Sequence, residues 1–255
     1  MFNKIYISEN EKTLIKLFKS ENFSLEHLNC LINDIVIADT NFYYLLSLGQ
    51  YASNCKCDIK NNSKLKWING ILKQTKVRNS ICFHVLNAFL NKLGNLSSSN
   101  KVCLLKDLPM RLLYDPNTTR VIYEMPIVVS PNMYEHAIKS ANEINSLNKY
   151  EFCKIIIKKS YCNMDVESLA LREFVLDNHL LCLPTPEITL VTLLDYYIEK
   201  LKLRDENHIC FKGFYDGVKL IDMCNRDALM RQVESQKNCN IIKYWISEIE
   251  NYFIV

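Results

Sequence analysis

Residues 111–131, RLLYDPNTTRVIYEMPIVVSP, decide the fold that the sequence predicts, because they lead from a loop into a short apolar run. Ile127, Val128 and Val129 follow directly after Pro126, so a buried strand is expected here. Glu124 stands two residues before Pro126. A carboxylate and a proline at the entry of a buried strand have two interpretations. One is a catalytic metal site, which uses paired acids at such a place, and the other is the remains of such a site.

The segments on either side of this run alternate between strand and helix. Upstream, the apolar run 101–106 predicts another buried strand, and 109–115 predicts one or two helical turns. Downstream, Ser130 is a candidate N-cap for a helix that starts at Pro131, and 153–171 supplies one or two further strands. Together these segments predict a small mixed βαβ-type centre.

Both ends of the chain are predicted to be helical. Residues 1–93 contain two Gly and no Pro, which favours long helices. Thr185, Pro186 and Glu187 form the expected start of a C-terminal helix, with cap, first position and acidic first turn. Helical spacing of apolar residues predicts helices over 11–20, 24–36, 63–94, 185–203, 213–235 and 239–253.

The polar stretch 95–100, NLSSSN, predicts a boundary between the first helical region and the centre. We therefore expect an α+β protein in three parts: an N-terminal helical region (1–97), an α/β core (98–182) and a C-terminal helical region (183–255). A chain of 255 residues is long enough for one large domain or two smaller ones.

The composition is that of an ordinary globular protein, with 49% hydrophobic and 23% charged residues. The formal net charge of +3 is too small to indicate a nucleic acid or an anionic membrane as partner. No uncharged apolar run approaches the roughly 20 residues of a membrane helix, and the N-terminus lacks a signal-peptide pattern. The sequence therefore predicts a soluble protein with neither a nucleic acid nor a membrane as partner.

The eleven cysteines are odd in number and mostly embedded in apolar runs, and only Cys55 and Cys57 lie close together. This pattern predicts reduced, buried thiols and a cytoplasmic location, rather than a zinc site or a disulfide framework. The five histidines lack metal-ligand spacing. The sequence contains no glycine-rich phosphate loop and no G-x-S-x-G or H-E-x-x-H motif.

A set of motifs in a defined order remains. CLLKD at 103–107 is followed by LLY at 112–114, by Arg120 and by EMPIVV at 124–129. This order resembles a family of bacterial nucleotidyltransferases found in gene clusters, several of them for modified-peptide natural products. In that family a strand runs into LLKG, a helix ends in an apolar–Tyr pair, and a turn with an Arg precedes DIDLLV. The resemblance covers most of the chain, because three further segments are similar to helices of the family: 77–94, 183–194 and 214–222.

The resemblance implies a nucleotidyltransferase-like mixed sheet and metal-dependent transfer of a nucleoside monophosphate. Two Mg²⁺ ions stabilise the attacking and leaving oxygens in such transfer, and D-x-D on a strand places both carboxylates on one face. Here Glu124 takes the first Asp position, and Pro126, which offers no ligand, takes the second. Asp107 takes the place of the Gly in LLKG. This exchange removes the residue that lets the backbone approach a phosphate, and it adds negative charge where a triphosphate would lie.

Other side chains are candidates for a rebuilt site. Asp165 and Glu167 are two residues apart, so they either share one strand face near the centre or belong to a solvated strand end or helix N-terminus. Lys106 and Arg120 are the candidate nucleotide-binding residues. Lys106 is either a phosphate ligand or an ordinary strand-end lysine. Arg120 either binds an anion or pairs with Glu124, and the ion pair is favoured.

These alternatives lead to three functional hypotheses. The favoured one is a non-catalytic protein of nucleotidyltransferase fold that binds a peptide, protein or nucleotide as an accessory in peptide natural-product biosynthesis. In the second, Glu124, Asp165 and Glu167 are the catalytic carboxylates of an active enzyme. It uses Mg²⁺ and an NTP, with Glu124 as metal ligand, and transfers NMP to a peptide, protein or small molecule. The third is a helical protein-interaction module, which needs no cofactor.

Overall fold

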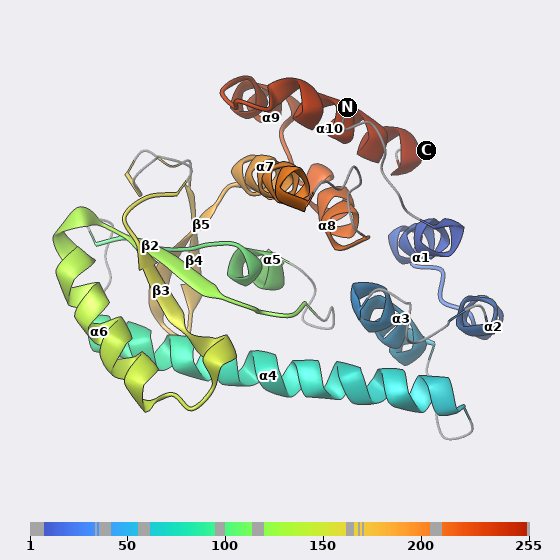
Figure 1. The fold of residues 1–255 in the computed structure, drawn as a ribbon, viewed down its shortest axis with the longest axis horizontal. Coiled ribbons are helices and arrows are strands. Elements are labelled where there is room, and N and C mark those ends of the chain that lie inside the picture. The colour runs from blue at the N-terminus through green and yellow to red at the C-terminus, as the bar shows by residue number, and fades with distance from the viewer. Residues whose placement is uncertain are drawn as a thin grey trace. The chain divides into compact units, whose positions relative to one another are not determined.

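Figure 1 shows the computed structural model, which describes residues 8–33, 35, 42–55, 62–94, 100–113, 120–161, 166, 167, 169, 171–204 and 211–253. The chain divides into two compact units. Unit 1 consists of residues 1–74, 117–119 and 186–255, and unit 2 of residues 75–116 and 120–185. The two helical regions that the sequence predicts as separate parts therefore fall into one unit. The second unit begins at residue 75, inside a helix, whereas the boundary was predicted at 95–100, of which residues 95–99 lie outside the described residues.

Unit 1 is helical wherever it is described in regular structure. Its first helix begins with a capping box, which was not predicted. The Ser8 hydroxyl accepts a hydrogen bond from the Glu11 N–H, and the Glu11 carboxylate accepts one from the Ser8 N–H. The helices are α1 (Glu9–Lys19), α2 (Leu25–Asn33), α3 (Phe42–Asn54), the first part of α4 (Ser63–Leu93), α7 (Pro186–Arg204), α8 (Phe211–Ile221), α9 (Arg226–Glu234) and α10 (Cys239–Phe253).

An aromatic cluster explains why the N-terminal and C-terminal helices form one unit. The ring of Phe18 on α1 lies edge-on to Tyr51 on α3 at 5.9 Å and to Tyr215 on α8 at 6.1 Å. Lys19, the last residue of α1, also pairs with Asp222 just after α8 at 3.4 Å. Since the contacts of Phe18 with Tyr215 and of Lys19 with Asp222 join residues about 200 positions apart in sequence, no local pattern could have predicted them.

Unit 2 is built on one five-stranded mixed sheet with the strand order β3-β2-β1-β5-β4. The pairs β1/β2 and β4/β5 are antiparallel, and β1/β5 and β2/β3 are parallel. This sheet, with helices flanking it, confirms the predicted α+β class. The strands are β1 (Val102–Leu104), β2 (Met125–Val129), β3 (Ile155–Lys158), β4 (Leu171–Leu176) and β5 (His179–Pro184), and the helical elements are α5 (Asp107–Leu113), η2 (Pro131–Met133), α6 (Tyr134–Leu147) and η3 (Glu151–Cys153).

The strands predicted at 101–106 and after Glu124 are confirmed as β1 and β2. Strand β5 was not predicted. It forms a hairpin with β4 through Asp177 and Asn178, whose φ angles are 46° and 69°. Two successive residues with positive φ form the two-residue turn that matches the twist of a hairpin, and Asp and Asn tolerate that conformation better than most residues.

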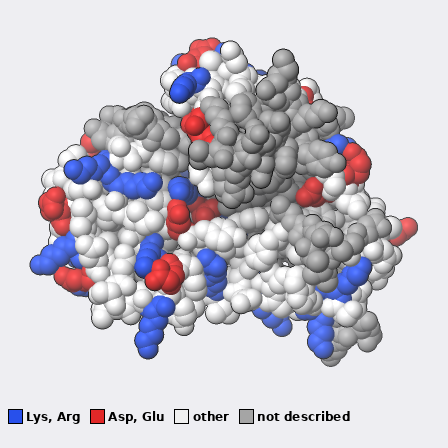
Figure 2. Space-filling view, in the orientation of Figure 1, with Lys and Arg blue, Asp and Glu red and all other residues white. Residues whose placement is uncertain are grey.

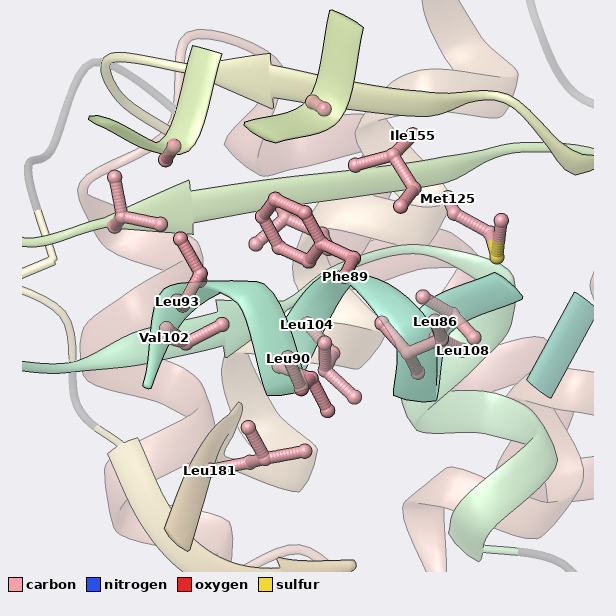
Figure 3. Close-up of a cluster of buried hydrophobic side chains, with 14 of the residues drawn as sticks. Leu86, Phe89, Leu90, Leu93, Val102, Leu104, Leu108, Met125, Ile155 and Leu181 are labelled. Atoms are coloured by element: carbon pink, nitrogen blue, oxygen red, sulfur yellow. The ribbon is translucent and has the colours of Figure 1, made fainter. Parts of the chain in front are cut away.

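The main core of unit 2 lies between the second part of α4 and one face of the sheet (Figure 3). Leu86, Phe89 and Leu90 on α4 are fully buried there. The sheet contributes the side chains of alternate residues to this core, because successive side chains of a strand point to opposite faces. These facing residues include Val102, Leu104, Met125, Ile127, Ile155, Leu181 and Leu183, with Leu108 from α5 and Ala137 from α6.

The opposite face of the sheet carries a smaller buried cluster, which includes the neighbouring residues Cys103 and Cys182. All eight described cysteines are free thiols, and four of them are buried, as predicted: Cys82, Cys103, Cys153 and Cys182. Cys30 is exposed, against the prediction, and Cys57, Cys162 and Cys210 lie outside the described residues. Burial raises the pKa of the Cys103 thiol well above its usual range.

Ser130 occupies the predicted N-cap position before Pro131, but its side chain does not cap the helix. Its side chain makes no capping hydrogen bond to η2, which begins at Pro131. The Ser130 hydroxyl instead accepts from the Lys101 N–H at 2.9 Å and donates to the Glu167 carboxylate at 3.0 Å. None of the described helices is long and apolar enough to cross a membrane.

Candidate functional site

The site indicated by the sequence motifs lies where β1 ends and β2 begins. Because β1 and β2 are antiparallel, with Leu104 opposite Ile127, the residues after β1 lie beside the residues before β2. Lys106 forms the turn after β1 and has a φ angle of 56°. A left-handed backbone costs a non-glycine residue roughly 1–2 kcal/mol, so this turn is strained. Asp107 follows as the first residue of α5.

Asp107 and Arg120 form a buried ion pair. Arg120 Nη2 lies 2.9 Å from Asp107 Oδ1. The Arg120 side chain is only 5% exposed and the Asp107 side chain only 12% exposed. The second carboxylate oxygen of Asp107 accepts from the Tyr123 N–H at 3.3 Å. The prediction that Arg120 pairs with Glu124 is therefore wrong. The negative charge that Asp107 brings to the Gly position of LLKG is also neutralised, because Arg120 pairs with it.

Asn79 on α4 holds the same segment from the other side. Its side-chain oxygen accepts from the Ile122 N–H at 3.1 Å, and its amide donates to the Arg120 carbonyl oxygen. Asn79 is buried and was not among the predicted site residues. A signal was present, since Asn79 interrupts the apolar series that continues with Cys82, Leu86 and Phe89 on one helix face.

Glu124 pairs with Lys106 across the two chain segments. The Lys106 Nζ lies 2.7 Å from Glu124 Oε2, and the side chains are 35% and 49% exposed, in that order. The candidate metal ligand and one candidate phosphate ligand thus neutralise each other. Since both are partly hydrated, this ion pair contributes little to stability.

Pro126 occupies a central strand, between β1 and β3. Its carbonyl oxygen accepts from the Leu105 N–H at 3.1 Å, but its ring nitrogen has no hydrogen to donate. Alternation places the side chains of residues 124 and 126 on one face of the strand. The position where a second carboxylate would complete a metal site therefore carries a buried pyrrolidine ring.

Glu167 lies at the other end of β2. It accepts from Ser130, directly after β2, and pairs with Lys101 at 2.7 Å, which raises the pKa of Lys101. Since a strand rises about 3.3 Å per residue, residues 124 and 130 are separated by roughly 20 Å. The structure therefore does not bring Glu124 and Glu167 together, and one cation cannot contact both. Asp165 lies outside the described residues.

Among the described side chains, no group of three or more His, Cys, Asp or Glu is arranged to hold a metal ion. The described site instead consists of two carboxylates, Glu124 and Asp107, each paired with a cation of the same site. Tyr114 of the LLY motif lies outside the described residues.

Comparison with protein-family models, with curated proteins and with solved structures gave no match for this chain.

Proposed function

We propose that this chain is a non-catalytic protein of nucleotidyltransferase type, which acts as a binding accessory in peptide natural-product biosynthesis. The order of the motifs from CLLKD to EMPIVV supports the family, and the chemistry of the site supports the loss of catalysis. A helical interaction module was the alternative for a chain without a mixed sheet, and unit 2 contains one.

One observation carries the non-catalytic part of the proposal: each cation suggested for nucleotide binding is held by a carboxylate of the same site. Lys106 pairs with Glu124, and Arg120 pairs with Asp107. Two-metal phosphoryl transfer needs carboxylates that are open to Mg²⁺ and cations that are open to phosphate. With Pro126 in place of the second carboxylate, this site offers neither set.

The test is an assay of NTP consumption. The purified protein is incubated with ATP, GTP, CTP or UTP, with Mg²⁺ or Mn²⁺, and released pyrophosphate is measured. We expect no release above a protein-free blank. Metal-dependent consumption of any NTP that Glu124→Ala abolishes would overturn the proposal, because it would show that Glu124 serves catalysis.

A thermal shift screen completes the test. A ligand that binds the native state raises its melting temperature by mass action. We expect each NTP to give the same shift in melting temperature with and without Mg²⁺, because both carboxylates of the described site are already paired with cations. A shift that requires Mg²⁺ and disappears in Glu124→Gln would contradict this expectation.

A further inference from the structure

Four side chains of unit 2 form a continuous stack, which we call the aromatic ladder: Tyr123, Arg78, Phe152 and Tyr150. The guanidinium carbon of Arg78 lies 4.3 Å from the ring centre of Phe152 and 5.2 Å from that of Tyr123. The ring centres of Phe152 and Tyr150 lie 5.3 Å apart. The ladder thus joins α4, the segment before β2, and the η3 turn before β3.

Hydrogen bonds fix both ends of the ladder. Tyr123 is held through its N–H by Asp107. At the other end, the Asn148 side chain accepts from the Tyr150 N–H at 3.0 Å and donates to the Cys153 carbonyl at 3.3 Å. Because these hydrogen bonds hold the backbone at both ends of the ladder, its side chains are positioned before a ligand binds, which lowers the entropic cost of binding.

The two ends of the ladder are exposed, whereas Arg78 and Phe152 between them are half-buried. Tyr123 is 43% exposed and Tyr150 is 49% exposed, and Leu147 at the end of α6, near Tyr150 in sequence, is 78% exposed. Exposed Tyr together with Arg is the composition of binding hot spots, because both offer a large contact area with polar groups at the rim.

Arg78 carries a charge that the described part of the chain does not neutralise. Its guanidinium lies over the two rings, and no carboxylate in that part of the chain pairs with it. Aromatic rings cover the guanidinium and its Nε is buried, so the Nη N–H groups in its plane are the ones left for a ligand. A carboxylate accepts two of them side by side, and this charge-assisted pair is stronger where rings exclude water.

We propose that the aromatic ladder is a docking surface for an acidic peptide segment, with one carboxylate on Arg78 and a neighbouring apolar side chain against Tyr150 or Tyr123. The inference rests on the partner-binding part of the proposed function and names the class of partner. The proposed docking surface is the ladder, and the Lys106–Glu124 pair is not part of it.

The charges around the ladder favour a peptide over a nucleic acid. Lys154 pairs with Glu151 at 2.6 Å beside Phe152, and Lys106 pairs with Glu124 beside Tyr123. A phosphate backbone needs a track of unpaired cations, and these two lysines beside the ladder already have carboxylate partners. On the coloured part of the face in Figure 2, Lys and Arg lie among Asp and Glu rather than in a continuous basic track.

The experiment uses a random 12-residue peptide display library, selected on the immobilised full chain, and a U20 RNA oligonucleotide as competitor class. We expect selected peptides to be enriched in Asp or Glu next to an apolar residue. By fluorescence anisotropy, Arg78→Gln should weaken the best peptide about ten- to hundredfold, as expected for a charge-assisted hydrogen bond. Lys139→Gln is the matched control, because it removes one exposed charge from α6 and should leave affinity unchanged.

Two further variants keep the test decisive if Arg78→Gln folds poorly. Arg78→Lys retains the charge but loses the planar pair of N–H groups, and Tyr150→Ala shortens an exposed side chain, so each should weaken binding several-fold. The proposal is overturned if no acidic enrichment appears, if binding ignores these variants, or if the RNA binds more tightly through Arg78. The NTP assay is independent of Arg78, so failure here and failure of the non-catalytic assignment are distinguishable.

Discussion

Lys106 and Glu124 form an ion pair of 2.7 Å at the surface, beside the buried pair of Asp107 and Arg120 at 2.9 Å. The two pairs link the same two chain segments, the turn after β1 and the residues before β2. They differ in hydration, and this difference decides their energetic roles.

Replacing Asp107 by Ala should cost about 3–5 kcal/mol of unfolding free energy, because it leaves Arg120 buried without its carboxylate. Glu124→Ala is the matched comparison and should cost less than about 1 kcal/mol, since both partners of its pair are partly hydrated. Urea unfolding followed by circular dichroism measures both values. Equal losses for the two variants would contradict the distinction between the pairs.

Lys106→Gly should be more stable than Lys106→Ala by about 1 kcal/mol, because residue 106 has a φ of 56°, which glycine adopts without strain. Both variants lose the ion pair with Glu124, so their difference isolates the backbone term. The measurement is the midpoint of urea unfolding. A more stable Ala variant would show that the left-handed turn is not maintained in solution.

Gly213 on α8 approaches the ring of Tyr197 so closely that an added Cβ would lie 2.6 Å from Cε2. We expect Gly213→Ala to lose about 1–3 kcal/mol, since an aromatic ring cannot give way as a flexible chain end can.

Gly70 on α4 is the control, because it has no neighbouring atom within 4 Å of such a Cβ. Gly70→Ala should gain up to about 1 kcal/mol from helix propensity. Thermal melting of both variants gives the comparison, and a stabilising Gly213→Ala would refute the close approach.

The thiols of Cys82 on α4 and Cys153 on η3 are buried 3.5 Å apart. Burial, reinforced by the contact with Cys153, raises the pKa of Cys82 to about 12. The unfolded chain therefore loses this proton at a lower pH than the native chain. Stability is fully present below the unfolded thiol pKa and is lost as pH rises from there towards 12.

From pH 9 to pH 10.5 the loss should reach about 1.4 kcal/mol per pH unit for this thiol. The measurement is the difference in urea midpoint between the unmodified chain and Cys82→Ala at each pH, which cancels the titration of other groups. A difference that does not change with pH would show that Cys82 is not held protonated by the fold.

The sequence by itself determined most helices and the two strands that frame the site. Apolar spacing placed α1, α2, α4 and α7, and short apolar runs placed β1 and β2. It also determined that the strand entry has one carboxylate, since Glu124 and Pro126 are covalent facts. Helix α3 escaped prediction because it is apolar on nearly every side and has no period to detect.

Only the tertiary structure decided which charges meet. Arg120 lies four residues before Glu124, yet it pairs with Asp107, because the α5 start and the segment before β2 are brought together by antiparallel strands. Glu124 and Glu167 were candidate carboxylates of one rebuilt site, yet the length of β2 separates them by roughly 20 Å. Secondary structure follows from local spacing, whereas an ion pair depends on strand direction and register, which are set by contacts distant in sequence.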